Sequence, residues 1–180
     1  MKHKLIKGVR IVDEGKDFVG DVYIKGDRIE KVAPSISLSS HLSIDEINAE
    51  GLVLLPGMID AHVHFREPGL TYKGDMRSES SAAIAGGITS IMDMPNTDPA
   101  VLSIDVLEQK YARAAASCHT NYSFFMGLSK DNLEEALRVS TEDVCGLTDD
   151  GLYFDEEHPT LCNSISFLEK IFSSSPHLIA

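Results

Sequence analysis

From residue 55 onward, segments with strand character and segments with helical spacing alternate without exception, and this alternation limits the fold more than any other feature. The pattern predicts strands over 55–63, 88–94, 122–126 and 144–147 and from 177 onward, and helices over 79–85, 103–118, 131–140 and 160–174. Strands separated by helices pair in parallel, because each helix returns the chain to the same end of the sheet. The sequence therefore predicts an α/β fold of parallel βα units, in a barrel or in an open sheet.

Three of these helices have an inward face that spacing predicts. In the helix over 103–118, one apolar stripe recurs at i, i+4, i+7, i+8 and i+11; it consists of Leu107, Tyr111, Ala114, Ala115 and Cys118. The helix over 160–174 has a similar stripe of Leu161, Ile165, Leu168 and Phe172. The helix over 131–140 is expected to follow an N-cap at Ser129, with Leu133, Ala136 and Leu137 inward.

Residues 1–54 have a different character and predict a separate small β-domain, part of a β-sandwich. Short apolar segments rich in Val, Ile and Tyr are separated by turn residues, and Gly26-Asp27 is placed as a hairpin turn. A serine-rich loop follows over 34–43, and no helical periodicity appears in this part of the chain. The predicted domains are therefore 1–54 and 55–180.

The charge of the chain argues against two classes of partner. The chain has 16 Lys and Arg and 28 Asp and Glu, so its net charge is 16 − 28 = −12. Phosphate repulsion then disfavours nucleic acid and anionic membrane surfaces as partners. No apolar run is long enough to span a bilayer, and no signal peptide is expected. The three cysteines show no CxxC pairing, which predicts reduced thiols in a cytoplasmic protein.

The strongest chemical signal is the pair His62 and His64, which closes the predicted strand over 55–63 just before a Pro68-Gly69 turn. Alternate residues of a strand point the same way, so both imidazoles share one face. Two neutral imidazole nitrogens at that separation suit one Zn²⁺ ion. The alternative is a chance pair of surface or core histidines, because the HxH pattern is short.

Three stretches of the chain, at the first three predicted strands, resemble the dihydroorotases of the amidohydrolase superfamily. These stretches are Asp60-Ala-His-Val-His-Phe-Arg-Glu-Pro-Gly69 with its continuation to Asp75, Met92-Asp-Met-Pro-Asn-Thr97, and Tyr122-Ser-Phe-Phe-Met-Gly127. The resemblance implies a TIM-type (β/α)₈ barrel that holds two Zn²⁺ in a complete site. It also implies interconversion of N-carbamoyl-L-aspartate and L-dihydroorotate in pyrimidine biosynthesis, with this small-molecule substrate as the main partner.

The same resemblance assigns Arg66 and Asn96 to the α-carboxylate of the substrate. A guanidinium fork can grip a carboxylate with two charge-assisted hydrogen bonds, and an amide adds one more donor without charge. The alternative for Arg66 is a surface ion pair with Glu67 or Asp75. For Asn96 the alternative is an ordinary turn residue after Pro95.

On the fourth predicted strand the chain departs from the family members that bridge two metals with a carbamylated lysine. No lysine lies between Val139 and Glu169, and Thr148-Asp149-Asp150-Gly151 stands there instead. This resembles the bacterial branch in which an aspartate bridges, and a carboxylate can span two cations. By motif match Asp150, rather than Asp149, is the predicted metal ligand; the alternative is a simple Asp-Asp-Gly turn.

A closed barrel needs roughly 250 residues, and only about 125 follow residue 55. The sequence therefore predicts strands 1–4 and the start of strand 5, in a truncated chain or with the missing half supplied from elsewhere. The family's general-base aspartate would lie beyond residue 180, so the chain alone is expected to show negligible turnover. A homo-oligomer is expected. The alternatives are another cyclic amidohydrolase of allantoinase or hydantoinase type, or a non-catalytic scaffold partner of aspartate transcarbamoylase.

Overall fold

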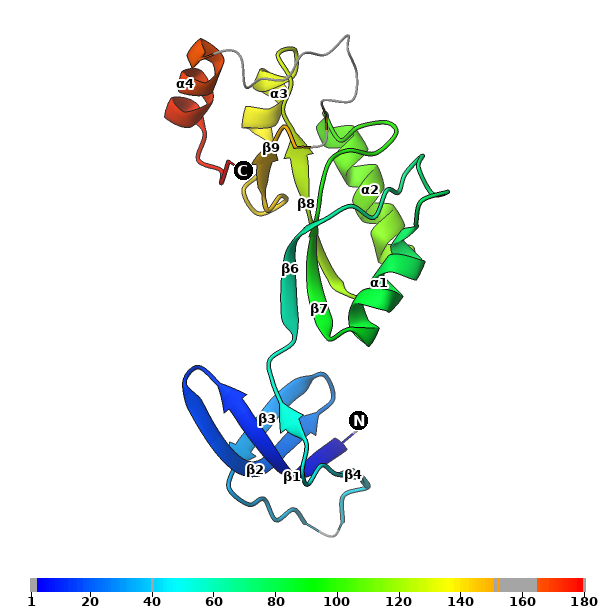
Figure 1. The fold of residues 1–180 in the computed structure, drawn as a ribbon, viewed down its shortest axis with the longest axis vertical. Helices are drawn as coiled ribbons and strands as arrows, with labels where there is room; N and C mark the ends of the chain where they lie inside the picture. The colour runs from blue at the N-terminus through cyan, green and yellow to red at the C-terminus, as the bar shows by residue number, and fades with distance from the viewer. Residues whose placement is uncertain (1–2, 40, 151, 153–164, 180) are drawn as a thin grey trace. The chain divides into compact units, whose positions relative to one another are not determined.

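The computed structural model describes residues 3–39, 41–150, 152 and 165–179 (Figure 1). The chain divides into two compact units, Met1–Pro56 and Gly57–Ala180. Among the described residues, no helix is both long enough and apolar enough to cross a bilayer.

The first unit is a five-stranded sheet. Its central part runs in the order β3-β2-β1-β4, and β5 also pairs with β1; the strands are β1 (His3–Asp13), β2 (Lys16–Lys25), β3 (Arg28–Ala33), β4 (Ile44–Asn48) and β5 (Val53–Leu54). β1, β2 and β3 pair antiparallel, whereas β4 and β5 pair with β1 in parallel. The predicted turn at Gly26-Asp27 is confirmed, with Gly26 at φ 66° between β2 and β3.

Asp21 is the buried polar centre of this unit. Its side chain accepts hydrogen bonds from the backbone N–H groups of Gly8 and Ile36, both at 2.9 Å. These two donors favour the ionised carboxylate and hold the pKa of Asp21 below its ordinary value. Asp21 therefore pins the loop after β3 to β1.

The second unit alternates strands and helices as predicted, and all its strand pairs are parallel. The elements are β6 (Met58–Val63), α1 (Met76–Ala85), β7 (Ile88–Asp93), α2 (Ile104–Ser117), β8 (Asn121–Gly127), α3 (Leu133–Arg138), β9 (Gly146–Thr148) and α4 (Ile165–Ser174). The sheet order β6-β7-β8-β9 follows the chain order, and α1 and α2 lie on the same side of it in Figure 1. A curled parallel sheet in chain order, backed by its own helices, is how a (β/α)₈ barrel begins.

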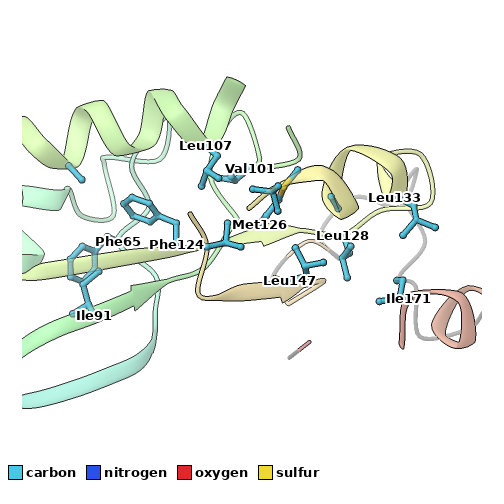
Figure 2. Close-up of a cluster of buried hydrophobic side chains, with 14 of the residues drawn as sticks. Phe65, Ile91, Val101, Leu107, Phe124, Met126, Leu128, Leu133, Leu147 and Ile171 are labelled. Carbon is cyan, nitrogen blue, oxygen red and sulfur yellow. The ribbon is translucent and has the colours of Figure 1, made fainter. Parts of the chain in front are cut away.

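One apolar core runs along the strands of this unit (Figure 2). Phe124 and Met126 of β8 and Leu147 of β9 are buried under Val101 and Leu107 of the loop and helix that follow β7. Only alternate strand residues can reach these helices, since successive side chains point to opposite faces.

Two helix starts differ from the prediction because polar side chains decide them. α1 begins at Met76 rather than 79, since Asp75 accepts a 2.7 Å hydrogen bond from the Ser78 N–H and forms a capping box. The predicted cap of α3 at Ser129 is wrong, and Asn132 is the N-cap residue. The Asn132 side-chain Oδ1 instead accepts from the Ser129 N–H at 2.7 Å, which fixes the preceding loop.

The predicted inward faces are right for α3 and partly wrong for α2 and α4. Ala115 is exposed, and Lys110 takes a place on the buried stripe of α2. In α4, Ile165 and Phe172 are exposed and Ile171 is buried, so the helix packs on a narrower stripe than predicted. Leu161 lies outside the described residues. Of the predicted fifth strand, a single parallel bridge joins Ile179 to Leu147.

Candidate metal centre and carboxylate site

The two predicted histidines converge at the end of β6. His62 is on the strand and His64 follows its last residue, and their Nε2 atoms lie 3.2 Å apart. The rings meet edge to face with centroids 5.1 Å apart. His62 is exposed and His64 is partly buried. The alternation of strand side chains thus brings both imidazoles to one point.

Asp150 reaches the same point from β9, the strand at the opposite edge of the sheet. It follows β9 by two residues, and its N–H donates to the Thr148 Oγ1 at 3.0 Å. Its Oδ2 lies 3.1 Å from His62 Nε2 and 3.9 Å from His64 Nε2. Asp150, not Asp149, therefore joins the two histidines in the described part of the chain.

The three atoms have the geometry and chemistry of a metal ligand set. A triangle with sides of 3.1, 3.2 and 3.9 Å has a circumradius of about 2.0 Å, which matches Zn–N and Zn–O bonds of about 2.0–2.2 Å. Two imidazole nitrogens and one carboxylate oxygen are also a known donor set for catalytic zinc. The residues present therefore fit a zinc ion.

Asn96 lies directly behind His64. Its Oδ1 is 2.9 Å from His64 Nδ1, and the residue is 7% exposed. Its Nδ2 is buried and has no hydrogen-bond partner among the described residues. A buried donor without an acceptor costs about 1–3 kcal/mol, and an acceptor on a bound molecule would remove that cost.

Arg66 is partly buried and has a positive φ of 66°. The predicted alternative, an ion pair with Glu67 or Asp75, is not formed in the part of the chain that the structure describes. Glu67 instead accepts from the Met76 N–H at 2.9 Å, and Asp75 caps α1. Both neighbouring carboxylates are thus engaged with the start of α1.

A buried ion pair beneath the site was not predicted. Lys110 of α2 is fully buried, and its Nζ lies 2.8 Å from Asp93 Oδ2 and 3.0 Å from the Met94 carbonyl oxygen. Asp93 Oδ1 accepts from the Phe65 N–H at 2.8 Å. Burial lowers the pKa of Lys110, and the Asp93 carboxylate opposes that shift. The sequence did contain one sign of this buried lysine: Lys110 lies three residues after Leu107 and so falls on the apolar stripe of the helix.

This ion pair fixes two loops at once. Phe65 lies between His64 and Arg66, and Met94 is two residues before Asn96. The two loops also meet where the Asp98 N–H donates to the Pro68 carbonyl oxygen at 3.1 Å. Lys110 and Asp93 therefore hold the segments that carry three of the five predicted site residues.

The remaining described histidines do not join this group. His177 Nε2 lies 2.9 Å from the Val139 carbonyl oxygen, and His3 Nδ1 lies 2.7 Å from the Tyr23 hydroxyl. Within the described ranges, His62, His64 and Asp150 form the one cluster of three or more potential metal ligands. His158 lies outside those ranges.

The parallel βα sheet in chain order places the second unit in the class of (β/α) barrel folds. The amidohydrolase family matches residues 53–159, and the chain belongs to that family. It is 35% identical to the dihydroorotase of Streptococcus pyogenes serotype M3 over 153 residues, which is 82% of this chain and 36% of that protein. It is 38% identical to the dihydroorotase of Wolbachia sp. subsp. Brugia malayi over 149 residues, 79% of this chain and 34% of that protein.

Solved structures agree on the fold. The L-hydantoinase of Arthrobacter aurescens superposes with a TM-score of 0.75 at 26% identity, covering 82% of this chain and 33% of that one. The chain thus spans about a third of the length of the relatives it matches. The predicted fold class, a β-sheet unit followed along the chain by the first part of a TIM-type barrel, is confirmed.

Proposed function

We propose that this chain carries part of the active site of a dihydroorotase, a zinc-dependent cyclic amide hydrolase of pyrimidine biosynthesis. The reaction interconverts N-carbamoyl-L-aspartate and L-dihydroorotate. One observation carries the proposal: a buried Asn96 amide with an unused donor stands directly behind an imidazole of the His-His-Asp cluster. The three potential metal ligands alone would fit any member of the family. The buried Asn96 donor beside them favours a substrate that has a hydrogen-bond acceptor, such as a carboxylate, next to the amide that reacts.

His62, His64 and Asp150 would hold the zinc, and a bridge from Asp150 to a second zinc remains a prediction. When bound, zinc supplies Lewis acidity that activates water and polarises an amide carbonyl. The task of the protein is to present the cyclic amide to that point in one orientation. Asp150 also brings negative charge to the strand ends, which favours a cation there.

Arg66 and Asn96 would orient the substrate through its α-carboxylate. The Arg66 guanidinium has no carboxylate partner among the described residues, so its charge is available for an anion. Asn96 Nδ2 would add a neutral donor to the same group. Anchoring the carboxylate fixes the ring at one end and leaves its amide carbonyl directed at the metal cluster.

The test compares substrates that differ in this carboxylate. In the full-length protein, Arg66→Met should raise the KM for dihydroorotate by about 100-fold, since a charge-assisted bond contributes about 1.5–3 kcal/mol. The same change should leave the KM for hydantoin, which has no carboxylate, within about threefold. Arg77→Met, on the exposed surface of α1, serves as the matched control. Equal losses on both substrates would contradict the assignment of Arg66.

A hydantoinase-type activity is the second candidate, favoured by the fold similarity to the Arthrobacter aurescens enzyme. Turnover of hydantoin or allantoin well above that of dihydroorotate would select it. The third candidate, a scaffold for aspartate transcarbamoylase, predicts no bound zinc and no turnover. The fit of His62, His64 and Asp150 to a zinc ion speaks against the scaffold.

For the 180 residues alone we propose negligible turnover, because they span about a third of the relatives' length. We also propose a cytoplasmic homo-oligomer. The free thiols of Cys118 and Cys145 support a reducing compartment. Light scattering at several concentrations tests the oligomer, and a concentration-independent monomeric mass would contradict it.

A further inference from the structure

Asp150 brings its carboxylate to the histidine pair from a position outside the strands. β9 ends at Thr148, and Asp150 lies in the turn two residues later. His62 and His64 come from the end of β6, at the opposite edge of the sheet. The pairing of β9 with its neighbour therefore does not by itself decide where the carboxylate lies, and a further contact is needed to hold the Asp150 backbone.

Thr148 supplies such a contact. Its Oγ1 accepts a hydrogen bond from the Asp150 N–H at 3.0 Å. A hydroxyl that accepts from the N–H two residues later closes a turn of the chain, much as a backbone carbonyl does in a β-turn. The Asp150 carboxylate at this turn has its Oδ2 3.1 Å from His62 Nε2 and 3.9 Å from His64 Nε2.

Thr148 is itself held firmly by the sheet. All three residues of β9 are buried, and Thr148 is 0% exposed. Its carbonyl oxygen accepts from the Leu128 N–H at 2.8 Å, and the residue pairs with Gly127 of β8. A β-branched side chain also has few rotamers open to it. The hydroxyl is therefore a fixed point from which the turn at Asp150 is built.

We propose that Thr148 is a positioning residue: its buried hydroxyl fixes the Asp150 backbone so that the carboxylate lies against His62 and His64 before any metal binds. The placement depends on the chain alone, whereas its use by a zinc ion rests on the proposed function. A ligand set formed in advance binds more tightly, because less of the chain has to be ordered on binding. Thr148 therefore raises zinc affinity without contacting the ion.

Three substitutions isolate the role of this hydroxyl. Thr148→Val replaces the hydroxyl with a methyl group of similar size and leaves the Asp150 N–H without this acceptor. Thr148→Ser keeps the hydroxyl and should behave as the wild type does. Thr120→Val is the matched control, because Thr120 is also buried, has its Oγ1 3.3 Å from Cys118 Sγ, and precedes the start of β8 rather than following a strand end.

The first measurement is hydrogen exchange of backbone amides in the metal-free protein. The Asp150 amide should exchange about ten-fold or more faster in Thr148→Val than in the wild type, and Thr148→Ser should retain the wild-type rate. The Leu128 amide, which bonds to the Thr148 carbonyl oxygen, should keep its rate in every variant. Equal acceleration of both amides would show general loosening and overturn the proposal. An unprotected Asp150 amide in the wild type would overturn it even if Thr148→Val failed to fold.

The second measurement is the zinc affinity of the same metal-free proteins, by competition with a chelating dye. Thr148→Val should bind zinc about ten-fold or more weakly, since loss of an outer partner of a metal ligand weakens affinity by about 10–100-fold. Thr148→Ser and Thr120→Val should match the wild type. A folded Thr148→Val with the zinc affinity of the wild type would overturn the proposal.

A double-mutant cycle tests whether the effect passes through Asp150. Asp150→Asn keeps the backbone N–H and removes the carboxylate, so adding Thr148→Val to it should weaken zinc binding by less than about twofold. Equal losses in the two backgrounds would place the action of Thr148 elsewhere and overturn the proposal. If the Asp150 amide depends on Thr148 as expected while the wild type binds no zinc, the positioning role is supported and the proposed zinc-dependent function is overturned.

Discussion

Replacing Lys110 with methionine would leave the Asp93 carboxylate charged and without a cation inside the protein. The change keeps an unbranched apolar stem of the same length but removes the ammonium 2.8 Å from Asp93 Oδ2. The Lys110 side chain is fully buried and that of Asp93 is 1% exposed, so water cannot replace the lost partner. The Met94 carbonyl oxygen loses its donor in the same step.

The expected loss of unfolding free energy is about 3–5 kcal/mol, the usual cost of removing one partner of a buried ion pair. That is a large share of the roughly 5–15 kcal/mol that stabilises a typical domain. The double variant Asp93→Asn with Lys110→Met should recover much of the loss, since it buries no charge and Asn Oδ1 can still accept from the Phe65 N–H. Replacing both partners of a buried pair is often close to neutral.

Hydrogen exchange of backbone amides is the suitable assay, because it reports the two units of the chain separately. In Lys110→Met, exchange of the Phe65 amide and of the β8 amides should accelerate by about two to four orders of magnitude. Arg10→Met is the control: it breaks an ion pair of similar length whose side chains are 56% and 51% exposed, so exchange should hardly change. A loss below about 1 kcal/mol, or a double variant no better than the single one, would refute the reasoning.

Three further predictions concern single residues. Gly69→Ala should destabilise the loop of Arg66 and weaken dihydroorotate binding while zinc binding persists, because a Cβ at φ +83° would clash with the Asp98 carbonyl oxygen. Gly15→Ala is the control: at φ +78° with nothing within 4 Å, it measures the cost of the positive φ alone. The pKa of Asp21 is lowered in the folded state, so its stabilising effect is complete above its unfolded pKa of about 3.9 and is lost as pH falls through the folded value. In urea titrations from pH 7 to pH 2, the difference in unfolding free energy between wild type and Asp21→Asn should therefore narrow below about pH 4. A constant difference would contradict this. Burial raises the pKa of Cys145 to about 11, so only about one thiol in a thousand is ionised at pH 8. Mass spectrometry should find Cys145 unmodified by iodoacetamide in the native chain and alkylated in urea. Rapid alkylation of the native chain would contradict this prediction.

The parts of the site that could be predicted follow from local periodicity. Two residues of separation on a strand suffice to put His62 and His64 on one face, and the strand–helix alternation suffices for a parallel sheet. The choice of Asp150 over Asp149 came from resemblance to a motif, and the contact with both histidines agrees with that choice. Whether these residues bind zinc is still a prediction.

The parts that could not be predicted depend on contacts between segments far apart in the chain. Nothing near Asn96 in the sequence indicates that its carbonyl faces a histidine 32 residues earlier. Lys110 was missed because spacing assigns a stripe to apolar residues and gives no reason to bury a cation without knowing that Asp93 lies opposite. Residue type alone favours Ser129 as the cap, whereas the Asn132 side chain bonds to two chain segments, at Leu102 and at 127–129.

The position of Lys110 on a helix has a consequence for how this region tolerates change. One residue inserted in α2 ahead of Lys110 would turn every later side chain by about 100° around the helix axis. The ammonium would then leave Asp93 and point toward another surface, although no residue of the cluster had been altered. Length variation in this family is therefore expected to be absent from the first half of α2. A relative with one or two extra residues there should have another cation in place of Lys110 to pair with the buried carboxylate.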